Sequence, residues 1–347
     1  MATGQVIAEE AAQVGQYTWD RPCAEESEAE VSEAVQEEVS EDLADLAEVR
    51  LEAVVLEEDG NTLRIKIMEK IKLYNGVEMP VLGYGLYKVD PEEAERCVSE
   101  AIRAGYRLID TARLYANEEG VGAAIAKSGI PREEFFIVTK VWINHSGEEK
   151  AYASILESLK KLNTSYVDLV LVHQPFGDYY GTYRALERAL EEGLTRSIGV
   201  SNFYPDRFYD LACHCKVIPM INQLEANVFS QQTQIRDLMK EYGTKVMAWA
   251  PMAQGKEDFH NNEVLARIGS RYSKTATQIG LRFLTQEGIV AIPKSSRFER
   301  MKENLEISDF ELTADEMETI RQMNEWDAGT RDYTSLPYVR RLISQKA

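Results

Sequence analysis

The chain has 347 residues, of which 44% are hydrophobic, and a formal net charge of −19. Its length suits one large domain or two average ones that bury a sizeable core. Residues 1–67 hold 18 acidic and 4 basic residues, and the rest hold 40 and 35. Neither part offers a basic face, so nucleic acid is not an expected partner.

Three further classes of protein are not expected. Four cysteines are too few for a disulfide scaffold in a chain of this length. The first residues lack the basic and apolar regions of a signal peptide. No apolar run approaches the roughly 20 residues of a membrane span. A cytoplasmic protein without a membrane partner is therefore expected.

Residues 1–67 form a unit of their own, an acidic extension before the main domain. Apolar residues at helical spacing predict an amphipathic helix in part of it: Val31, Val35, Val39, Leu43 and Leu46. Residues 51–56 and 62–67 instead indicate a hairpin around Asp59-Gly60-Asn61. The extension is expected to be partly disordered or a small appended module, with a protein partner as one alternative and a natural start at Met68 as another.

The main domain, residues 68–347, opens with a predicted hairpin over residues 71–80. Asn75-Gly76 lies between its strands, and this pair suits a type I′ turn. A first buried strand is expected over residues 81–85. Asp90 and Pro91 then mark the start of a helix that Gly105 ends.

The same strand and helix unit repeats along the rest of the chain. Further strands are expected at 108–110, 135–140, 167–172, 197–200, 220–223, 245–249 and 289–293. Helices are expected at 118–127, 148–162, 180–192, 205–213, 231–242, 262–272, 277–287, 298–304 and 313–323, with a short final helix in the tail. No Gly-x-Gly-x-x-Gly motif opens a Rossmann unit. Eight alternating units predict an α/β fold, a (β/α)8 TIM barrel with an N-terminal β-hairpin cap.

Four polar side chains follow three successive predicted strands. Asp110, Lys140 and His173 stand at strand ends, and Tyr115 lies in the loop after Asp110. Taken singly, each has an ordinary structural explanation, such as a helix cap, an ion pair or packing. The carboxyl ends of barrel strands converge on one mouth, where barrel enzymes carry their chemistry. The set therefore indicates an active site.

These residue types suit the reduction of a carbonyl group. Hydride transfer to the carbonyl carbon leaves charge on oxygen, to which Tyr115 would supply a proton. A buried Lys140 is expected to lower the phenol pKa from about 10. Asp110 would keep that lysine charged, and a neutral His173 would orient the substrate oxygen.

Five longer motifs resemble the aldo-keto reductases in order and register. They are 110–115 (DTARLY), 139–142 (TKVW), 171–175 (LVHQP), 199–203 (GVSNF) and 292–295 (IPKS). The resemblance covers about residues 68–324, and is closest to the bacterial members that include 2,5-diketo-D-gluconate and glyoxal or methylglyoxal reductases. It implies NADPH-dependent reduction of small polar aldehydes and ketones, such as methylglyoxal or diketo sugar acids, with Tyr115 as the general acid.

The resemblance also implies an NADPH site without a Rossmann fold. Ser201, Asn202 and Gln223 match positions that bind the nicotinamide carboxamide, a task that suits their hydrogen-bonding groups. Trp249 stands where the family usually has a stacking tyrosine, and an indole keeps the stacking face.

A second set of residues matches the other end of the cofactor. Lys294, Ser295 and Arg300 match the positions that bind the adenosine 2′-phosphate, which favours NADPH over NADH. Glu303 and Asn304 match the adenine contacts. The alternative for Arg300 and Glu303 is a solvated helix face.

Three residues are expected in the substrate pocket: Tyr87, Trp142 and Gln174. Tyr87 and Gln174 replace tryptophans that some members carry, which makes the pocket more polar. No metal site is expected, because Cys213-His214-Cys215 lacks the rest of a zinc set. A monomer is expected. Two alternatives remain, an NADPH-binding redox sensor or regulatory subunit with little turnover, and a hydrolase or aldolase that uses Lys140 as a Schiff-base nucleophile.

Overall fold

The computed structural model describes residues 50–58, 62–256, 258–325 and 329–347. The helix predicted around Val31–Leu46 lies outside these residues. Within them, no helix is long and apolar enough to cross a membrane.

Two antiparallel pairings precede the barrel. Strand β1 (Arg50–Glu58) pairs with β2 (Thr62–Lys72), as the hairpin alternative for this part of the chain predicted. Strand β2 continues without a break past residue 67 and pairs with β3 (Glu78–Pro80), so the second predicted hairpin is confirmed. The role and boundary of the extension stay a prediction.

The turn between β2 and β3 is not the predicted type I′ turn. Gly76 N–H donates to the Leu73 carbonyl at 2.8 Å, so Tyr74 and Asn75 are the central residues of the turn. Only Gly76 has a positive φ, at 88°, whereas a type I′ turn needs positive φ at both central residues. The geometry is that of a three-residue loop closed by a glycine in the left-handed region.

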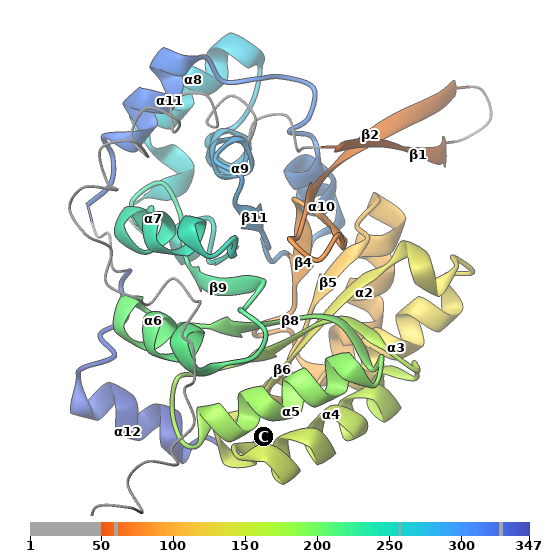
Figure 1. The fold of residues 1–347 in the computed structure, drawn as a ribbon. Helices are drawn as coiled ribbons and strands as arrows, with labels where there is room; N and C mark the ends of the chain where they lie inside the picture. Colours follow the sequence, from red (N-terminus) through yellow and green to blue (C-terminus); the bar gives the residue numbers. More distant parts are fainter. Residues whose placement is uncertain (1–49, 59–61, 257, 326–328) are drawn as a thin grey trace, which may run out of the picture. The chain divides into compact units, whose positions relative to one another are not determined.

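Eight parallel strands then form the barrel that the sequence predicted (Figure 1). They are β4 (Gly83–Gly85), β5 (Leu108–Asp110), β6 (Phe136–Val141), β7 (Val167–Val172), β8 (Thr195–Ser201), β9 (Ile221–Glu225), β10 (Lys245–Trp249) and β11 (Val290–Ala291). Each pairs with its neighbour in chain order. The Leu82–Ala291 bridge and a 3.1 Å bond from Gly85 N–H to the Pro293 carbonyl join the first strand to the last.

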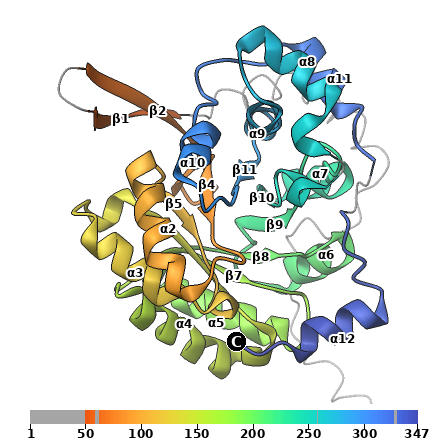
Figure 2. The ribbon, with the colours of Figure 1, turned by 180° about the vertical axis from the view of Figure 1, so that it is seen from behind.

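Helices surround the barrel, as Figure 2 shows from behind. They are α2 (Pro91–Ala104), α3 (Glu118–Lys127), α4 (Glu148–Leu162), α5 (Tyr179–Glu191), α6 (Pro205–His214), α7 (Thr233–Glu241), α8 (Glu263–Tyr272), α9 (Ala276–Gln286), α10 (Phe298–Leu305), α11 (Ala314–Arg321) and α12 (Leu336–Ser344). Barrel elements start and end within two residues of their predicted bounds. The largest differences have local causes. Helix α7 begins late because Gln232 has φ 57°, and β11 ends at Ala291, two residues before Pro293.

Local capping explains where several helices start and end. Thr275 and Thr313 form capping boxes with Gln278 and Glu316. Gly105 ends α2 in the left-handed region at φ 116°. Asp90 occupies the predicted N-cap position of α2, but its side chain makes no capping hydrogen bond.

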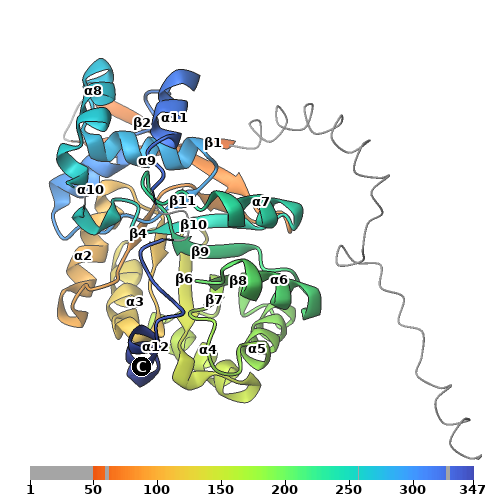
Figure 3. The same ribbon diagram turned by 90° about the vertical axis from the view of Figure 1, so that its left-hand side faces the viewer.

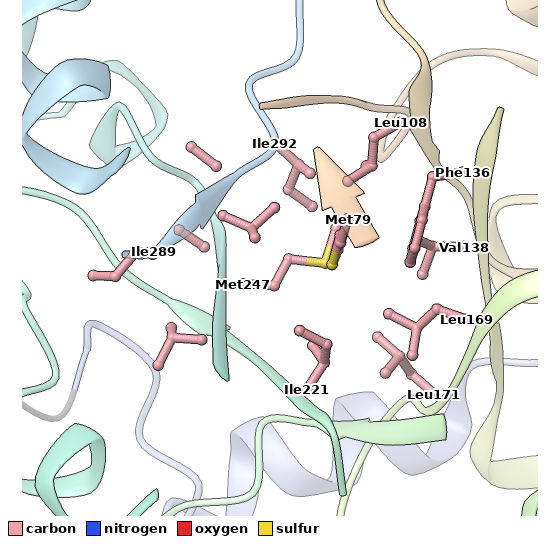
Figure 4. Close-up of a cluster of buried hydrophobic side chains, with 14 of the residues drawn as sticks. Met79, Leu108, Phe136, Val138, Leu169, Leu171, Ile221, Met247, Ile289 and Ile292 are labelled. Atoms are coloured by element: carbon pink, nitrogen blue, oxygen red, sulfur yellow. The ribbon is translucent and has the colours of Figure 1, made fainter. Parts of the chain in front are cut away.

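Buried apolar side chains fill the space that the strands enclose. Figure 4 shows part of this cluster, to which the hairpin strand β3 contributes Met79. Leu108, Phe136, Leu169 and Met247 are likewise almost fully buried there. The barrel interior is therefore a packed core rather than a pore, as in other barrels of this kind.

Candidate active site

The side chains that face the barrel core on each strand continue into the site at the strand end. Side chains two residues apart on a strand point to the same face. Leu108 therefore shares its face with Asp110, Val138 with Lys140, and Ile221 with Gln223. The apolar residue sits in the packed interior, and the polar residue lies two positions further toward the carboxyl end of the strand.

Asp110 and Lys140 form a buried ion pair. Lys140 Nζ lies 2.6 Å from Asp110 Oδ1 and donates to the Thr111 carbonyl at 2.9 Å. Gln223 Nε2 donates to the second carboxylate oxygen of Asp110 at 2.8 Å. Burial raises the pKa of Asp110 and lowers that of Lys140, and the charge of each partner opposes the shift of the other. The ion pair and these hydrogen bonds favour the charged forms of both side chains against the burial that opposes them.

Tyr115 ends a short 3₁₀ helix, η2 (Arg113–Tyr115), directly after β5. Its hydroxyl lies 3.5 Å from Lys140 Nζ, and the Lys140 ammonium lies 5.0 Å from the centre of the Tyr115 ring. Burial, and then the Asp110 carboxylate, raise the pKa of Tyr115 well above 10. The predicted lowering is therefore wrong, because burial, the larger cause, and the Asp110 charge both favour the protonated phenol. The phenol keeps its proton at neutral pH, as a proton donor must.

His173 directly follows β7 and is the last of the four predicted catalytic residues. Its ring makes edge contacts with Tyr115 and Trp142, at centroid distances of 5.6 and 4.8 Å. Burial, and then the charge of Lys140, lower the pKa of His173 well below 6.5, so the ring is neutral near pH 7, as the sequence predicted. Its buried Nδ1 has no hydrogen-bond partner among the described residues.

The low pKa of His173 predicts how the free energy of unfolding depends on pH. Below the ordinary histidine pKa of about 6.5, the unfolded chain binds a proton that the folded chain does not, so acidification favours unfolding. When the pH falls from about 7.5 to about 5.5, the free energy of unfolding should therefore decrease by about 1 kcal/mol less in His173→Gln than in the natural protein. Urea unfolding at the two pH values measures this difference. Equal losses in both proteins would contradict the lowered pKa.

The residues predicted at the nicotinamide end hydrogen-bond to one another. Asn202 Nδ2 donates to Ser201 Oγ at 2.9 Å and to the His173 carbonyl at 3.2 Å. Its Oδ1 accepts from Trp249 Nε1 at 3.0 Å. The Gln223 carbonyl accepts from Ser201 Oγ at 2.9 Å, and its side chain donates to Asp110, a link that the sequence did not predict. These bonds connect the predicted cofactor residues, through Gln223, to the Asp110–Lys140 pair.

The residues predicted at the adenosine end come from the loop after β11 and from α10. Lys294 and Arg300 make no ion pair with any carboxylate in the described part of the chain. The Ser295 carbonyl accepts from Tyr84 at 2.6 Å, which fixes this loop to β4. Glu303 Oε1 accepts from Thr275 at 2.8 Å. The loop is thus held through its backbone, and no carboxylate among the described residues pairs with Lys294 or Arg300.

One cavity of about 910 Å³ joins the two ends. Fifteen of the sixteen predicted site residues line it, including Tyr87, Trp142 and Gln174. The exception is Lys140, which lies behind Asp110 and Tyr115 with its side chain fully buried. The structure thus brings together side chains from strands and loops throughout the barrel. No group of three His, Cys, Asp or Glu side chains suited to a metal occurs within the described ranges.

Several residues that support the site were missed by the sequence analysis. Glu118 is almost fully buried and accepts from Thr139, the neighbour of Lys140, at 2.6 Å. Asn117 bonds Thr111 at 2.6 Å and donates to the Leu86 carbonyl at 3.2 Å, which holds the loop of Tyr87 beside that of Tyr115. The Asn117-Glu118 pair follows the motif at 110–115 after one residue, Ala116, and this position was the available signal.

The C-terminal segment was also missed as part of the cavity wall. In Figure 3 the dark blue chain that leads to α12 crosses in front of the barrel. Six of its residues line the cavity: Arg331, Tyr333, Tyr338, Arg341, Leu342 and Gln345. The Gln345 carbonyl accepts from Trp142 Nε1 at 3.0 Å. The tail thus closes one side of the site.

Comparison with known proteins identifies the family of this chain. The profile of the Aldo/keto reductase family matches residues 81–325. Glyoxal reductase of Bacillus subtilis is 43% identical over 261 residues, which cover 75% of this chain and 94% of that protein. Methylglyoxal reductase DkgA of Yersinia pestis is 38% identical over 264 residues, with 75% and 94% covered. The crystal structure of a Bombyx mori aldo-keto reductase in complex with NADP matches with a TM-score of 0.71 and 33% identity, over 76% of this chain and 95% of that one. The chain therefore belongs to the aldo/keto reductase family of oxidoreductases, as its motifs predicted.

Proposed function

We propose that the protein reduces small aldehydes and ketones to alcohols with NADPH. The observation that carries this proposal is the arrangement at the mouth of the barrel. A buried Asp110–Lys140 pair lies behind a protonated Tyr115, and a neutral His173 lies beside it in the same cavity. The named activities of the glyoxal and methylglyoxal reductases support a small polar carbonyl as substrate.

The residues present suit NADPH. The cofactor would supply a hydride to the carbonyl carbon. Ser201, Asn202 and Gln223 offer hydrogen-bonding groups at one end of the cavity, where Trp249 offers an aromatic face. At the other end, Lys294 and Arg300 are cations without a carboxylate partner in the described residues, which suits a phosphate.

The side chains act on the charge that develops at the carbonyl oxygen. His173 donates a hydrogen bond to that oxygen and orients the carbonyl group toward the reacting face. Tyr115 O–H gives its proton to the oxygen as negative charge accumulates there. Lys140, 3.5 Å from the phenol oxygen, stabilises the phenolate that remains. Asp110 holds the lysine in place, and the buried walls exclude water.

The proposal is tested by mixing the full chain with NADPH and a panel of methylglyoxal and other small aldehydes. Loss of reduced-nicotinamide absorbance, together with the alcohol product, is the expected result. NADPH binding without turnover of any carbonyl would overturn the proposal in favour of a sensor or regulatory subunit. A covalent adduct trapped by borohydride at Lys140 would instead show Schiff-base chemistry.

A further inference from the structure

A short segment after β6 connects several parts of the active site. It consists of Trp142 and the 3₁₀ helix η4 (Ile143–His145) that follows. The Trp142 ring contacts the His173 ring, and its Nε1 donates to the Gln345 carbonyl. His145, at the other end of the segment, is half-buried and has no part in the proposed reaction. Its contacts nevertheless reach two elements of the site.

The first partner of His145 is Arg113, the first residue of η2. Arg113 Nε donates to His145 Nε2 at 3.0 Å. The Arg113 side chain is largely buried, and its Nη1 also lies 2.7 Å from Glu157 Oε2 on α4. Helix η2 is a single turn that ends at Tyr115, the proposed proton donor. The contacts of Arg113 therefore hold the turn that carries Tyr115.

The second partner of His145 is the C-terminal segment that closes one side of the cavity. The ring hydrogen-bonds the backbone of Ala347, two residues beyond Gln345. Trp142 and His145 thus hold this segment at two points. Since His145 also bonds Arg113, it joins the turn of Tyr115 to the cavity wall formed by the C-terminal segment.

The bond from Arg113 requires an uncharged His145. A guanidinium has N–H donors and no acceptor, so His145 Nε2 must be the unprotonated nitrogen of a neutral ring. The ring proton then lies on Nδ1. A second proton, added at Nε2, would remove the acceptor and place a positive charge 3.0 Å from Arg113 Nε. The junction seen here therefore exists only with the neutral ring.

Charged and polar groups on three elements around His145 influence its protonation. Burial, and then the Arg113 charge on η2, lower the pKa of His145 below 6.5, and Lys150 on α4 acts in the same direction. The Ala347 backbone and the Glu157 carboxylate on α4 oppose this shift. The net direction is downward, so the ring is neutral near pH 7.5 and gains its second proton only in acid.

We propose that His145 is a positioning residue for the reaction: its neutral ring holds the Tyr115 turn and the C-terminal segment together, and its protonation releases them. This inference rests on the proposed reductase function. Neither His145 nor Arg113 lines the cavity, so both act through the elements that they join. Loss of the junction lowers kcat/KM for the carbonyl substrate. The residues predicted to bind the nicotinamide keep their own bonds, such as that of Trp249 to Asn202, so NADPH affinity is unchanged.

Two replacements of His145 test the proposal. A glutamine amide can accept from Arg113 and donate to the Ala347 backbone at any pH, whereas leucine can do neither. Near pH 7.5, His145→Gln should match the natural protein in kcat/KM for methylglyoxal, and His145→Leu should be about fivefold lower, the effect of about one hydrogen bond. Near pH 5, the natural protein should fall to the level of His145→Leu, and His145→Gln should be about fivefold higher than both.

Hydrogen–deuterium exchange measures the junction without turnover. Near pH 7.5, the amides of α12 should exchange faster in His145→Leu than in the natural protein, and at the natural rate in His145→Gln. NADPH affinity, followed by quenching of protein fluorescence, should be equal in all three. His214→Gln is the matched control, because His214 is exposed and bonds Asp210 on its own helix. This variant should keep the natural pH dependence and the natural exchange rates.

The proposal would be overturned, and the reductase left intact, if His145→Gln showed the same pH dependence as the natural protein. Equal losses of activity in His145→Gln and His145→Leu near pH 7.5 would also overturn it, because they would assign His145 a packing role. Failure of the natural protein to reduce any carbonyl compound would overturn the proposed function itself. In that case unchanged exchange of α12 in His145→Leu would overturn the junction as well, and faster exchange would support it.

Discussion

Replacing Tyr115 by phenylalanine should lower kcat for carbonyl reduction by about 10²–10⁴-fold, the usual contribution of a positioned general acid. The variant loses only the hydroxyl, which lies 3.5 Å from Lys140 Nζ, and keeps the ring that packs against His173. The fold and NADPH affinity should therefore change little. Steady-state kinetics with methylglyoxal and a fluorescence titration with NADPH measure both quantities.

The neighbouring tyrosine offers a control with the same chemical change. Tyr87 lines the same cavity, and its ring is in contact with that of Tyr115, but no hydrogen bond joins its hydroxyl to a lysine among the described residues. Tyr87→Phe should keep kcat within a fewfold of the natural value. If Tyr115→Phe retained most of its turnover, or if both variants lost it equally, Tyr115 would not be the proton donor.

Replacing Lys140 by methionine should both abolish turnover and destabilise the fold by about 3–5 kcal/mol, because it leaves the Asp110 carboxylate buried without its partner. The side chain of Lys140 is fully buried and that of Asp110 almost so, which makes the cost of the unpaired charge large. Urea unfolding followed by circular dichroism measures the stability, and NADPH oxidation measures the activity.

A double variant separates the two roles of the pair. Asp110→Asn with Lys140→Met removes both charges and leaves a neutral amide that can still accept from Gln223. It should recover most of the lost stability, since neutral replacement of a buried pair is often tolerated, but not the activity. If the double variant were no more stable than Lys140→Met, the unpaired carboxylate would not be the cause of the instability.

The sequence determined the barrel because the signals for its elements are local. Short apolar runs alternate with helices, and residues such as Pro91 and Gly105 mark the helix ends. These signals predict the elements within two residues of their observed bounds. The same rule of alternation takes Leu108 into the core and Asp110 to the barrel mouth. It also predicts that Gln223 faces the same way as Ile221, but the bond of Gln223 to Asp110, 113 residues earlier, is seen only in the structure.

Features of the site that depend on contacts between segments distant in the sequence were decided only by the tertiary structure. The Gln345 carbonyl of the C-terminal tail accepts a hydrogen bond from Trp142, which lies 203 residues earlier in the chain. Every residue has a backbone carbonyl, so this contact leaves no signal in the sequence. The arginines of the tail look like ordinary solvated charges until their place on the cavity wall is known. The pKa of Tyr115 likewise depends on its burial and on the nearby Asp110 charge, which are set by positions in space rather than by residue type.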